Sequence, residues 1–240
     1  MIVYGRNPVR EALRGRRSQA VGEIWATAGA AREPWLAGRT VRAASAREIE
    51  QRCGSDANQG ICAEAGPYPY ADARALLALR EPLLVALDQV QDPQNLGSIC
   101  RTAECAGAAG VIVPERRAAE ITPAACKASA GAVEHLAVAR VRNLADFLGE
   151  AREAGCWTYG ASAAGDARRE PVPYDQPDYA GAGVVLVLGS EGRGLRPRVA
   201  AGCDQLVALP LRGQIESLGV AAAAAALLYE ILQKRLDSSS

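Results

Sequence analysis

An amide and an arginine lie close together in one predicted helix, between two apolar runs. The runs, residues 83–87 and 111–113, are expected to be neighbouring buried strands of a parallel sheet. Asn95 is predicted to cap the helix between them, residues 95–107, and Arg101 lies within its first two turns. Open α/β sheets bind ligands at the carboxyl ends of their strands. Asn95 and Arg101 are therefore suited to bind a phosphate or a ribose, although an ordinary cap beside a solvated arginine explains the spacing equally well.

A second candidate site is the glycine-rich stretch that follows the most apolar predicted strand, residues 184–188. Glycines at 189, 192 and 194 permit positive φ angles and let a ligand approach the backbone. Their spacing differs from the G-x-G-x-x-G pattern of dinucleotide-binding loops, and no acidic residue is placed to hold a ribose after the next strand. A nicotinamide-dependent enzyme is therefore disfavoured. The alternative to a ligand-binding loop is a tight structural turn.

A third polar segment, residues 209–218, connects the last predicted strand to the last predicted helix, residues 215–235. Ser217 is expected near the start of that helix. The single histidine, His135, has no cysteine at metal-ligand spacing, so neither a histidine base nor a zinc site is expected.

Strands and helices alternate from residue 83 to the end of the chain. The expected strands are 83–87, 110–113, 136–141, 156–160, 184–188 and 205–209. The expected helices are 95–107, 122–130, 143–154, 196–202 and 215–235. This alternation predicts an α/β fold with a mostly parallel sheet covered by helices on both faces.

Residues 1–66 are expected to form a separate, smaller α/β domain. Asn7 is predicted to cap its first helix, with Pro8 at the first helical position. The other expected elements are strands 21–27, 41–43 and 61–65 and helices 32–38 and 45–53. Residues 67–82 are predicted to be a linker that two prolines stiffen, with a short helix over 71–80. The second domain then covers residues 83–240.

The charge of the chain is balanced overall but not along its length. The 240 residues carry 27 basic and 27 acidic side chains. Residues 1–80 hold 12 arginines and 8 acidic residues, or +4, and the remainder holds 15 basic and 19 acidic residues, or −4. This asymmetry favours RNA contact by the first half. A GC-rich genome explains the abundance of arginine equally well.

Two further features bear on location. No run of eighteen apolar residues occurs, and the amino terminus has no signal-peptide core, so neither a membrane partner nor secretion is expected. The seven scattered cysteines are expected to be reduced thiols in a cytoplasmic protein.

Three ordered stretches resemble the motifs of one enzyme family. They read DPQNLGSICRTAECAGAAGVIV from residue 92, VVLVLGSEGRGL over 184–195, and VALPLRGQIESLGVAAAAAALLYE over 207–230. Together they resemble the SpoU/TrmH family of RNA ribose 2'-O-methyltransferases, within the SPOUT superfamily. The opening residues, IVYGRNPVREAL over 2–13, resemble the substrate domain of the subgroup that modifies a guanosine of 23S rRNA.

This resemblance implies a cofactor, a chain topology and an assembly. The cofactor is S-adenosylmethionine, held largely through backbone groups of Gly189, Leu209 and Leu218. The second domain is expected to contain a deep trefoil knot at its carboxyl end, a rare exception to the rule against threading. A homodimer is expected to form through the final helix, with the active sites near its interface.

The resemblance also assigns roles around the reaction centre. Arg101 is implied to be the catalytic residue, and positioning of the target phosphate is favoured over proton abstraction because arginine stays protonated. Asn95 is implied to order the first motif, and Glu191 and Ser217 match polar positions of the active site.

Family members of this subgroup hold RNA with their small first domain. The residues expected to contact RNA are polar or aromatic side chains near its first helix and turns: Tyr4, Arg6, Asn7, Arg16, Arg17, Asn58 and Gln59. For each of them, a solvated surface or turn position is the competing explanation.

One departure from the family pattern keeps other functions open. The last motif of the family usually reads Ser-Leu-Asn-Val-Ser, whereas this chain has Gly219 and Ala221 in place of the asparagine and the second serine. Slow methyl transfer with intact cofactor binding is therefore expected. The alternatives are a tRNA ribose methyltransferase of the same family and a non-catalytic RNA-binding or ribosome-assembly factor.

Overall fold

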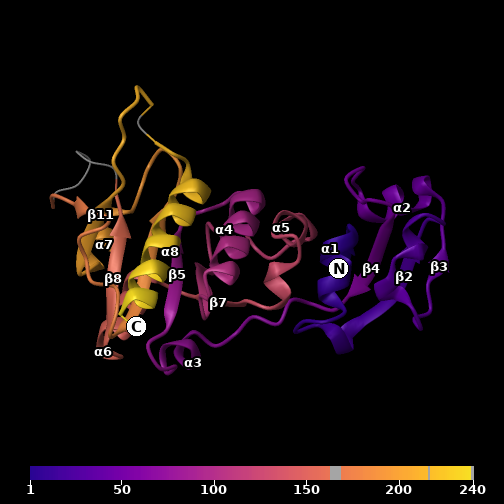
Figure 1. The fold of residues 1–240 in the computed structure, drawn as a ribbon, viewed down its shortest axis with the longest axis horizontal. Coiled ribbons are helices and arrows are strands. Elements are labelled where there is room, and N and C mark those ends of the chain that lie inside the picture. The colour runs from indigo at the N-terminus through magenta and orange to yellow at the C-terminus, as the bar shows by residue number, and fades with distance from the viewer. Residues whose placement is uncertain (163–168, 216, 239–240) are drawn as a thin grey trace.

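The chain folds around two separate β-sheets in the computed structural model. The structure describes residues 1–162, 169–215 and 217–238. Figure 1 shows an elongated molecule in which the first sheet lies at one end of the long axis and the second sheet towards the other. Helices α4 (Pro93–Cys105) and α5 (Pro123–Ala128) lie between the two sheets.

The first sheet has the strand order β1-β4-β2-β3. Strand β4 (Ile61–Ala65) pairs antiparallel with β1 (Ile2–Tyr4) and β2 (Val21–Ala26), and β2 pairs parallel with β3 (Arg42–Ala43). Helix α1 covers Arg6–Ala12, and α2 covers Ala46–Cys53 behind a capping box of Ser45 and Glu48. The helix predicted over 32–38 is instead two short 3₁₀ turns, Ala30–Arg32 and Pro34–Leu36. Pro34 separates them because it cannot continue a helix from the preceding turn.

The second sheet is parallel throughout and has the order β7-β6-β5-β10-β8-β11-β9. Its strands are β5 (Leu83–Asp88), β6 (Gly110–Pro114), β7 (Ala137–Val141), β8 (Cys156–Ala161), β9 (Val172–Pro173), β10 (Gly183–Gly189) and β11 (Gln205–Ala208). The remaining helices are α3 (Ala73–Leu77), α6 (Leu144–Glu153), α7 (Pro197–Gly202) and α8 (Val220–Asp237). The predicted mostly parallel α/β sheet beside a small first domain is therefore confirmed.

Alternate residues of the central strands face two different cores. Leu83, Val85 and Leu87 of β5 join the core under α4 and α8, whereas Leu84 and Ala86 join the core under α3, α6 and α7. Both faces of the sheet are thus buried, which explains the uninterrupted apolar runs of β5 and β10. The carboxyl ends of the strands stay free of this packing and carry the loops of the candidate site.

Three helix starts differ from the prediction. Helix α1 begins at Arg6 behind Gly5, so Asn7 lies inside the helix and is not its cap. Asp92, not Asn95, caps α4, since its carboxylate accepts a hydrogen bond from the backbone N of Gln94 at 2.9 Å. Pro93 then occupies the first helical position, where its fixed φ is favourable. Helix α8 begins at Val220 rather than at 215, because Gly219 has φ 77° and ψ 145°, far from helical values. Asn95 thus lies inside the first turn of α4, and Ser217 lies outside α8.

The segment predicted to be a linker packs against the second domain. The buried Tyr68 hydroxyl donates a hydrogen bond to the carbonyl of Val133 at 2.9 Å. The backbone N of Ala71 donates to the carbonyl of Val138 at 2.8 Å. Because these bonds reach the residues around β7, the segment holds the two domains together and does not act as a free spacer.

Candidate active site

The candidate site lies at the carboxyl ends of β5 and β10, which are paired neighbours in the centre of the sheet. Asp88 and Gly189 are the last residues in register between them. Three segments leave the sheet here: the start of α4, the loop Ser190–Arg196 and the loop that leads into α8. Ligands of open α/β sheets bind at this kind of edge.

Asn95 and Glu191 meet across this edge. The side-chain amide of Asn95 donates a hydrogen bond to Oε1 of Glu191 at 3.1 Å; Asn95 is half-buried and Glu191 is exposed. Gly219 lies on the other side of the same carboxylate, where a Cβ added to Gly219 would stand 3.5 Å from Oε1 of Glu191. Three positions singled out in three different motifs therefore converge on one carboxylate.

Arg101 is exposed on α4. Its side chain takes part in no hydrogen bond or salt bridge with another described residue, and the structure does not bring it into contact with Asn95 or Glu191. Its guanidinium is thus available to a ligand. A planar guanidinium with free N–H groups matches a phosphate bidentately.

Glycines shape the loop after β10 because the chain turns back on itself there. The backbone N of Gly194 donates to the carbonyl of Ser190 at 3.0 Å, and the two residues form an isolated β-bridge. A Cβ on Gly189 would lie 2.2 Å from the carbonyl carbon of Gly194, so no larger residue fits without moving the loop. Gly192 and Gly194 have positive φ angles of 77° and 61°.

The sequence reasoning missed the residue that anchors this loop. Asp88 is fully buried at the end of β5, and its carboxylate accepts bonds from the backbone N of Arg196 at 2.8 Å and from its Nε at 2.7 Å. A carboxylate that ends an otherwise apolar buried strand is the signal that could have identified it. Asp88 and Arg196 hold the far end of the loop so that Glu191 faces Asn95.

The loop into α8 is the most exposed part of the site, and Figure 1 shows it extending beyond the helices. Ile215 and Leu218 are 76% and 52% exposed. Ser217 makes a local contact only, since its Oγ accepts a hydrogen bond from the backbone N of Gly219 at 3.2 Å. Ser217 is therefore not brought into contact with the Asn95–Glu191 pair.

The residues expected to bind the cofactor present backbone groups at this edge of the sheet. Gly189 ends β10, and Leu209 and Leu218 lie at the two ends of the exposed loop. The backbone N–H and C=O groups of Leu209 and Leu218 make no hydrogen bond with another described residue. Free backbone donors and acceptors can pair with the edge of an adenine, and the close turn at Gly189 leaves no side chain in the way. The chain thus fits an adenosine-containing cofactor.

Three of the residues expected to contact RNA are buried or held in local bonds. Arg17 is 2% exposed, and its guanidinium bonds to Glu134, to the carbonyl of Gly66 and to the thiol of Cys126. Tyr4 packs in a small core with Trp25, Ile49 and Cys62. Asn58 closes its own turn with Ser55 and Gly60. These three side chains are therefore not free to contact RNA as predicted, because other partners hold Arg17 and Asn58 and because Tyr4 is buried in a core.

The other expected RNA contacts remain on the surface. Asn7 and Arg16 are exposed. Arg6 is exposed as well, although its Nη1 lies 2.9 Å from Oε1 of Glu33. Gln59 has φ 55° and accepts a bond from the backbone N of Arg6 at 2.9 Å. Arg6, Asn7 and Arg16 thus form the available polar surface around α1.

Within the part of the chain that the structure describes, no group of three or more histidine, cysteine or acidic side chains is arranged to hold a metal ion. Nor does any helix in the described ranges combine the length and the apolar character required to cross a bilayer.

Two family models match the chain, one for each sheet. The model of the SpoU rRNA Methylase family matches residues 82–229. The model of the RNA 2'-O ribose methyltransferase substrate binding domain matches residues 2–71. Among curated relatives, YacO of Bacillus subtilis (strain 168), whose name places it among TrmH family tRNA/rRNA methyltransferases, is 38% identical. That alignment covers 82% of this chain and 79% of the relative.

Solved structures of methyltransferases resemble this chain over different lengths. The AdoMet-bound rRNA methyltransferase from Sinorhizobium meliloti has a TM-score of 0.79 and 28% identity, over 97% of this chain and 86% of its own. The SpoU methyltransferase AviRb from Streptomyces viridochromogenes, in complex with AdoMet, has a TM-score of 0.79 and 25% identity, over 99% and 91%. The A. aeolicus TrmH/SpoU tRNA modifying enzyme reaches a TM-score of 0.58 and 25% identity, over 69% of this chain and 83% of its own.

Proposed function

We propose that this chain, which belongs to the SpoU family and is an S-adenosylmethionine-dependent RNA methyltransferase, methylates the ribose 2'-hydroxyl of a guanosine in 23S rRNA. The observation that supports rRNA as the substrate is the share of this chain that resembles each solved structure. The rRNA methyltransferase from Sinorhizobium meliloti matches 97% of this chain, including the first domain, whereas the tRNA modifying enzyme matches 69%. A domain that accompanies the catalytic sheet in rRNA enzymes favours the same substrate class here.

The chemistry required of the side chains is modest. When bound, S-adenosylmethionine supplies a methyl group that its sulfonium already activates. The chain must hold the target ribose in line and keep its hydroxyl at the mouth of the site. In this proposal Arg101 binds the phosphate of the target nucleotide, since its exposed guanidinium has no partner among the described residues. Gly189, Leu209 and Leu218 bind the cofactor through their backbone groups.

Asn95 and Glu191 are proposed to position this machinery. Their hydrogen bond of 3.1 Å ties α4, which carries Arg101, to the loop that follows β10. Loss of the bond would let the phosphate-binding arginine and the cofactor-binding loop move independently. Ser217 is proposed to enter the site when the exposed loop closes over a ligand.

We also propose a homodimer and a cytoplasmic location. The loop into α8 and the outer surface of α8 expose Leu211, Ile215, Leu218, Tyr229 and Leu236, an apolar surface beside the site that a second copy would cover. All seven cysteines are free thiols, which suits a reducing compartment.

Methyl transfer from radiolabelled S-adenosylmethionine to separate 23S rRNA and tRNA transcripts tests the substrate. We expect incorporation into 23S rRNA, with a primer-extension stop at one guanosine at low nucleotide concentration. The stop should be absent from rRNA of a deletion strain. Incorporation into tRNA alone would replace the proposed substrate by the tRNA alternative. Cofactor and RNA binding without incorporation into either RNA would favour the assembly-factor alternative.

A further inference from the structure

The arginines of the second domain that the structure describes fall into two groups by their partners. Six of them are engaged by acidic side chains or by backbone carbonyls: Arg140, Arg152, Arg169, Arg196, Arg198 and Arg235. Another six are exposed and form no salt bridge or side-chain hydrogen bond with another described residue: Arg101, Arg116, Arg117, Arg142, Arg193 and Arg212. The second group is thus the one whose guanidinium groups have no partner among the described residues.

Every member of the unpaired group follows the carboxyl end of a strand. Arg101 follows β5, Arg116 and Arg117 follow β6, and Arg142 follows β7. On the other side of the site, Arg193 follows β10 and Arg212 follows β11. The order of the strands in the sheet therefore places the loops that carry Arg116, Arg117, Arg142, Arg193 and Arg212 in one row, with the Asn95–Glu191 pair near its middle. Five steps of about 4.8 Å between β7 and β11 give the row a length of about 24 Å.

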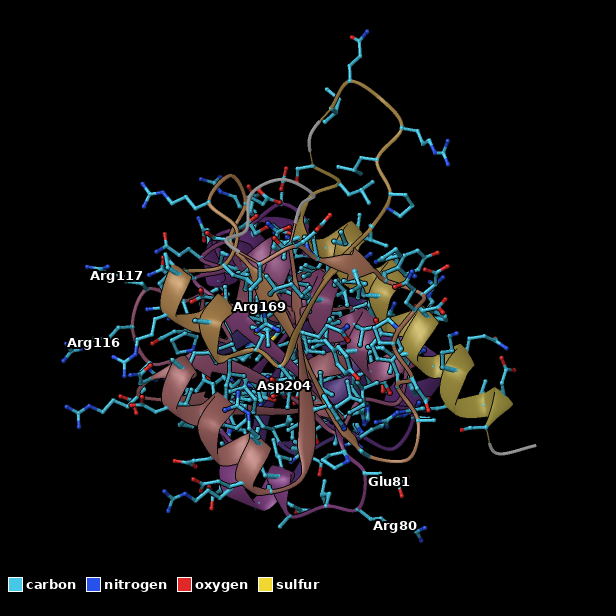
Figure 2. The ribbon with its side chains drawn as sticks, turned by 90° about the vertical axis from the view of Figure 1, so that its left-hand side faces the viewer. Arg80, Glu81, Arg116, Arg117, Arg169 and Asp204 are labelled. Atoms are coloured by element: carbon cyan, nitrogen blue, oxygen red, sulfur yellow. The ribbon has the colours of Figure 1, made fainter. Side chains whose placement is uncertain are left out.

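The loop after β6 presents its two arginines to solvent. Arg117 has φ 57°, which is uncommon for a residue with a Cβ. The backbone N of Ala119 donates to the carbonyl of Val90 at 2.8 Å, so this loop is bonded to the loop that leads into α4. Figure 2 shows Arg116 and Arg117 projecting from one flank of the molecule, well away from Arg80 and Glu81 at its base. The segment between β6 and α5 carries these two arginines and two acidic side chains, Glu115 and Glu120, and Glu120 is paired with Arg140.

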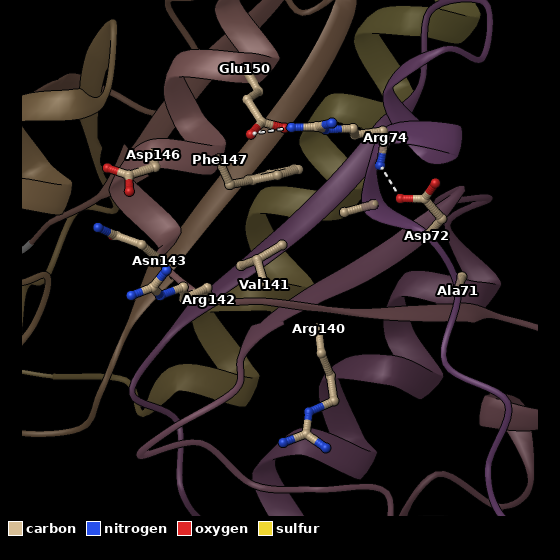
Figure 3. A pocket seen from close by; sticks show the side chains of 11 residues that line it. Ala71, Asp72, Arg74, Arg140, Val141, Arg142, Asn143, Asp146, Phe147 and Glu150 are labelled. Atoms are coloured by element: carbon tan, nitrogen blue, oxygen red, sulfur yellow. Dashed lines mark hydrogen bonds and ion pairs between the residues drawn. The ribbon is translucent and has the colours of Figure 1, made fainter.

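Arg142 extends the row to the edge strand. It lies at a cavity of about 300 Å³. The other arginines of this cavity are engaged: Arg74 pairs with Glu150, and Arg140 pairs with Glu120. Figure 3 shows the bond between Arg74 and Glu150, whereas Arg142 has no partner among the residues drawn.

The β7 side of the row leads towards the first domain. Residues 132–134, which precede β7, contact α1, and Ala71 bridges to Ala139 of β7 itself. In the strand order, β6 and β7 with Arg116, Arg117 and Arg142 therefore lie on the side of the candidate active site that is next to the domain matching the substrate-binding model. A polyanion that touches both places would pass over them.

We infer that Arg116, Arg117 and Arg142 bind the phosphate backbone of the RNA substrate between the active site and the first domain. This inference rests on the proposed function and adds a binding surface that extends beyond the target nucleotide. Unpaired guanidinium groups bind phosphates with planar forks and release condensed counterions from the RNA. Three such groups act on affinity and not on the methyl transfer step.

Affinity for a fluorescein-labelled 20-nucleotide oligouridylate, measured by anisotropy from 50 to 300 mM KCl, tests this surface. Each lost phosphate contact should reduce the slope of log K against log salt by about 0.7 for a single strand. For the triple variant R116A/R117A/R142A, we expect the magnitude of this slope to be smaller by about 2. The variant should bind the oligonucleotide roughly 10- to 100-fold more weakly near 0.1 M salt. Calorimetric binding of S-adenosylmethionine should be unchanged, which also reports that the variant is folded.

The double variants R116A/R117A and R74A/R80A form a matched comparison. Both remove two exposed arginines, but Arg74 and Arg80 already pair with Glu150 and Glu81. We expect only R116A/R117A to lower the slope and to raise the KM for the 23S rRNA transcript while kcat stays within twofold. Equal losses in both doubles, or a triple variant identical to the natural protein, would overturn the inference. If the natural protein binds and methylates RNA while the triple variant is unaffected, the proposed function stands without this surface. If the natural protein binds no RNA, both proposals are rejected.

Discussion

Arg17 and Glu134 form a buried ion pair that joins the two domains. The Nε of Arg17 donates to Oε2 of Glu134 at 3.0 Å, its Nη2 bonds to the other carboxylate oxygen, and the two side chains are 1% and 0% exposed. The carbonyl of Gly66 accepts a further bond from Nη1 at 3.2 Å. Burial by itself lowers the pKa of Arg17, but the hydrogen bond and charge of Glu134 outweigh it and raise that pKa. The pair therefore holds the first domain in a fixed orientation.

Without one member of this pair, the protein should unfold far more easily. We expect Arg17→Ala to lower the free energy of unfolding by about 3 to 5 kcal/mol, because it leaves the Glu134 carboxylate buried without its partner. Urea unfolding followed by circular dichroism measures the change. Arg16→Ala, one residue away on the surface, is the matched control and should stay within about 0.5 kcal/mol. Equal stability of the two variants would show that the pair is not a structural connection.

Asp204 makes the stability of the second sheet depend on pH. Its carboxylate accepts bonds from the backbone N of Thr158 at 2.9 Å, from Oγ1 of Thr158 at 2.7 Å and from Nε of Arg152 at 2.9 Å. Partial burial raises the pKa of Asp204, but the bonds from Thr158 and Arg152 outweigh burial and hold that pKa below the usual 3.8. Figure 2 labels Asp204 beside Arg169, whose guanidinium bonds to the carbonyls of Cys203 and Asp204.

A lowered carboxylate pKa stabilises the fold above the unfolded pKa, and this stabilisation is lost as pH falls through the folded pKa. We expect Asp204→Asn to cost about 1 to 2 kcal/mol at pH 7 and progressively less below pH 3.8. Urea unfolding at pH 7 and at pH 2.5 compares the two conditions. Asp146→Asn is the control, because Asp146 is 63% exposed and lies 3.5 Å from Arg198. A deficit of the Asp204→Asn variant that is the same at both pH values would contradict the role of its charge.

The proposed homodimer predicts a single dominant species of twice the chain mass. Light scattering at micromolar concentration should report a dimer, because a second copy would bury the exposed apolar side chains of α8 and of the preceding loop. Tyr229→Lys, at a position that is 52% exposed on α8, should shift the protein towards monomer. Leu79→Lys changes a side chain of 49% exposure outside α8 and should not. A monomeric natural protein would rule out the dimer.

Arg101 is predicted to be indispensable for methyl transfer. We expect Arg101→Ala to reduce transfer at least 100-fold, in the range seen when a group that contacts the reacting centre is removed, while cofactor affinity changes less than threefold. Arg101→Lys should recover little, because a point charge does not reproduce the planar fork. Single-turnover transfer with radiolabelled cofactor measures the rate. Arg198→Ala, which removes a guanidinium that is already paired, is the control. Full activity of Arg101→Ala would remove this residue from the site.

Local sequence patterns predicted the sheet well and its long-range bonds poorly. The runs of β5, β6 and β10 are apolar on both faces, so the sequence identified them as buried strands, whereas it did not reveal their order in the sheet. The cap of α4 was misplaced because Asp92 and Asn95 are both good caps, and Pro93 decides between them. The knot implied by the family resemblance stays a prediction.

Partners far apart in the chain explain what the sequence did not reveal. Arg17 resembles an exposed residue in a basic turn, yet its partner Glu134 lies 117 positions away. The bond between Asn95 and Glu191 joins residues 96 positions apart. The family motifs brought Asn95 and Glu191 into one predicted site, whereas no motif pointed to Asp88 or to the Arg17–Glu134 pair.

Gly219 replaces a family asparagine, and the structure explains why restoring the asparagine has two opposed effects. A side chain at 219 would approach Oε1 of Glu191, which Asn95 already contacts, so an amide there would add a second donor to the same carboxylate. The backbone of Gly219, with φ 77° and ψ 145°, lies near a region that is almost restricted to glycine. Any larger residue therefore needs the loop to shift, at a cost of about 1 to 3 kcal/mol.

We predict that the natural protein binds S-adenosylmethionine but transfers methyl roughly 10- to 1000-fold more slowly than an enzyme with the missing donor. Gly219→Asn should then accelerate single-turnover transfer despite lower stability. Gly219→Ala carries the same backbone strain without an amide and separates the two effects. Faster transfer by Gly219→Asn than by both Gly219→Ala and the natural protein would establish the amide as the missing group. Fast transfer by the natural protein, with no gain in Gly219→Asn, would show that the carboxylate of Glu191 needs only Asn95 as its donor.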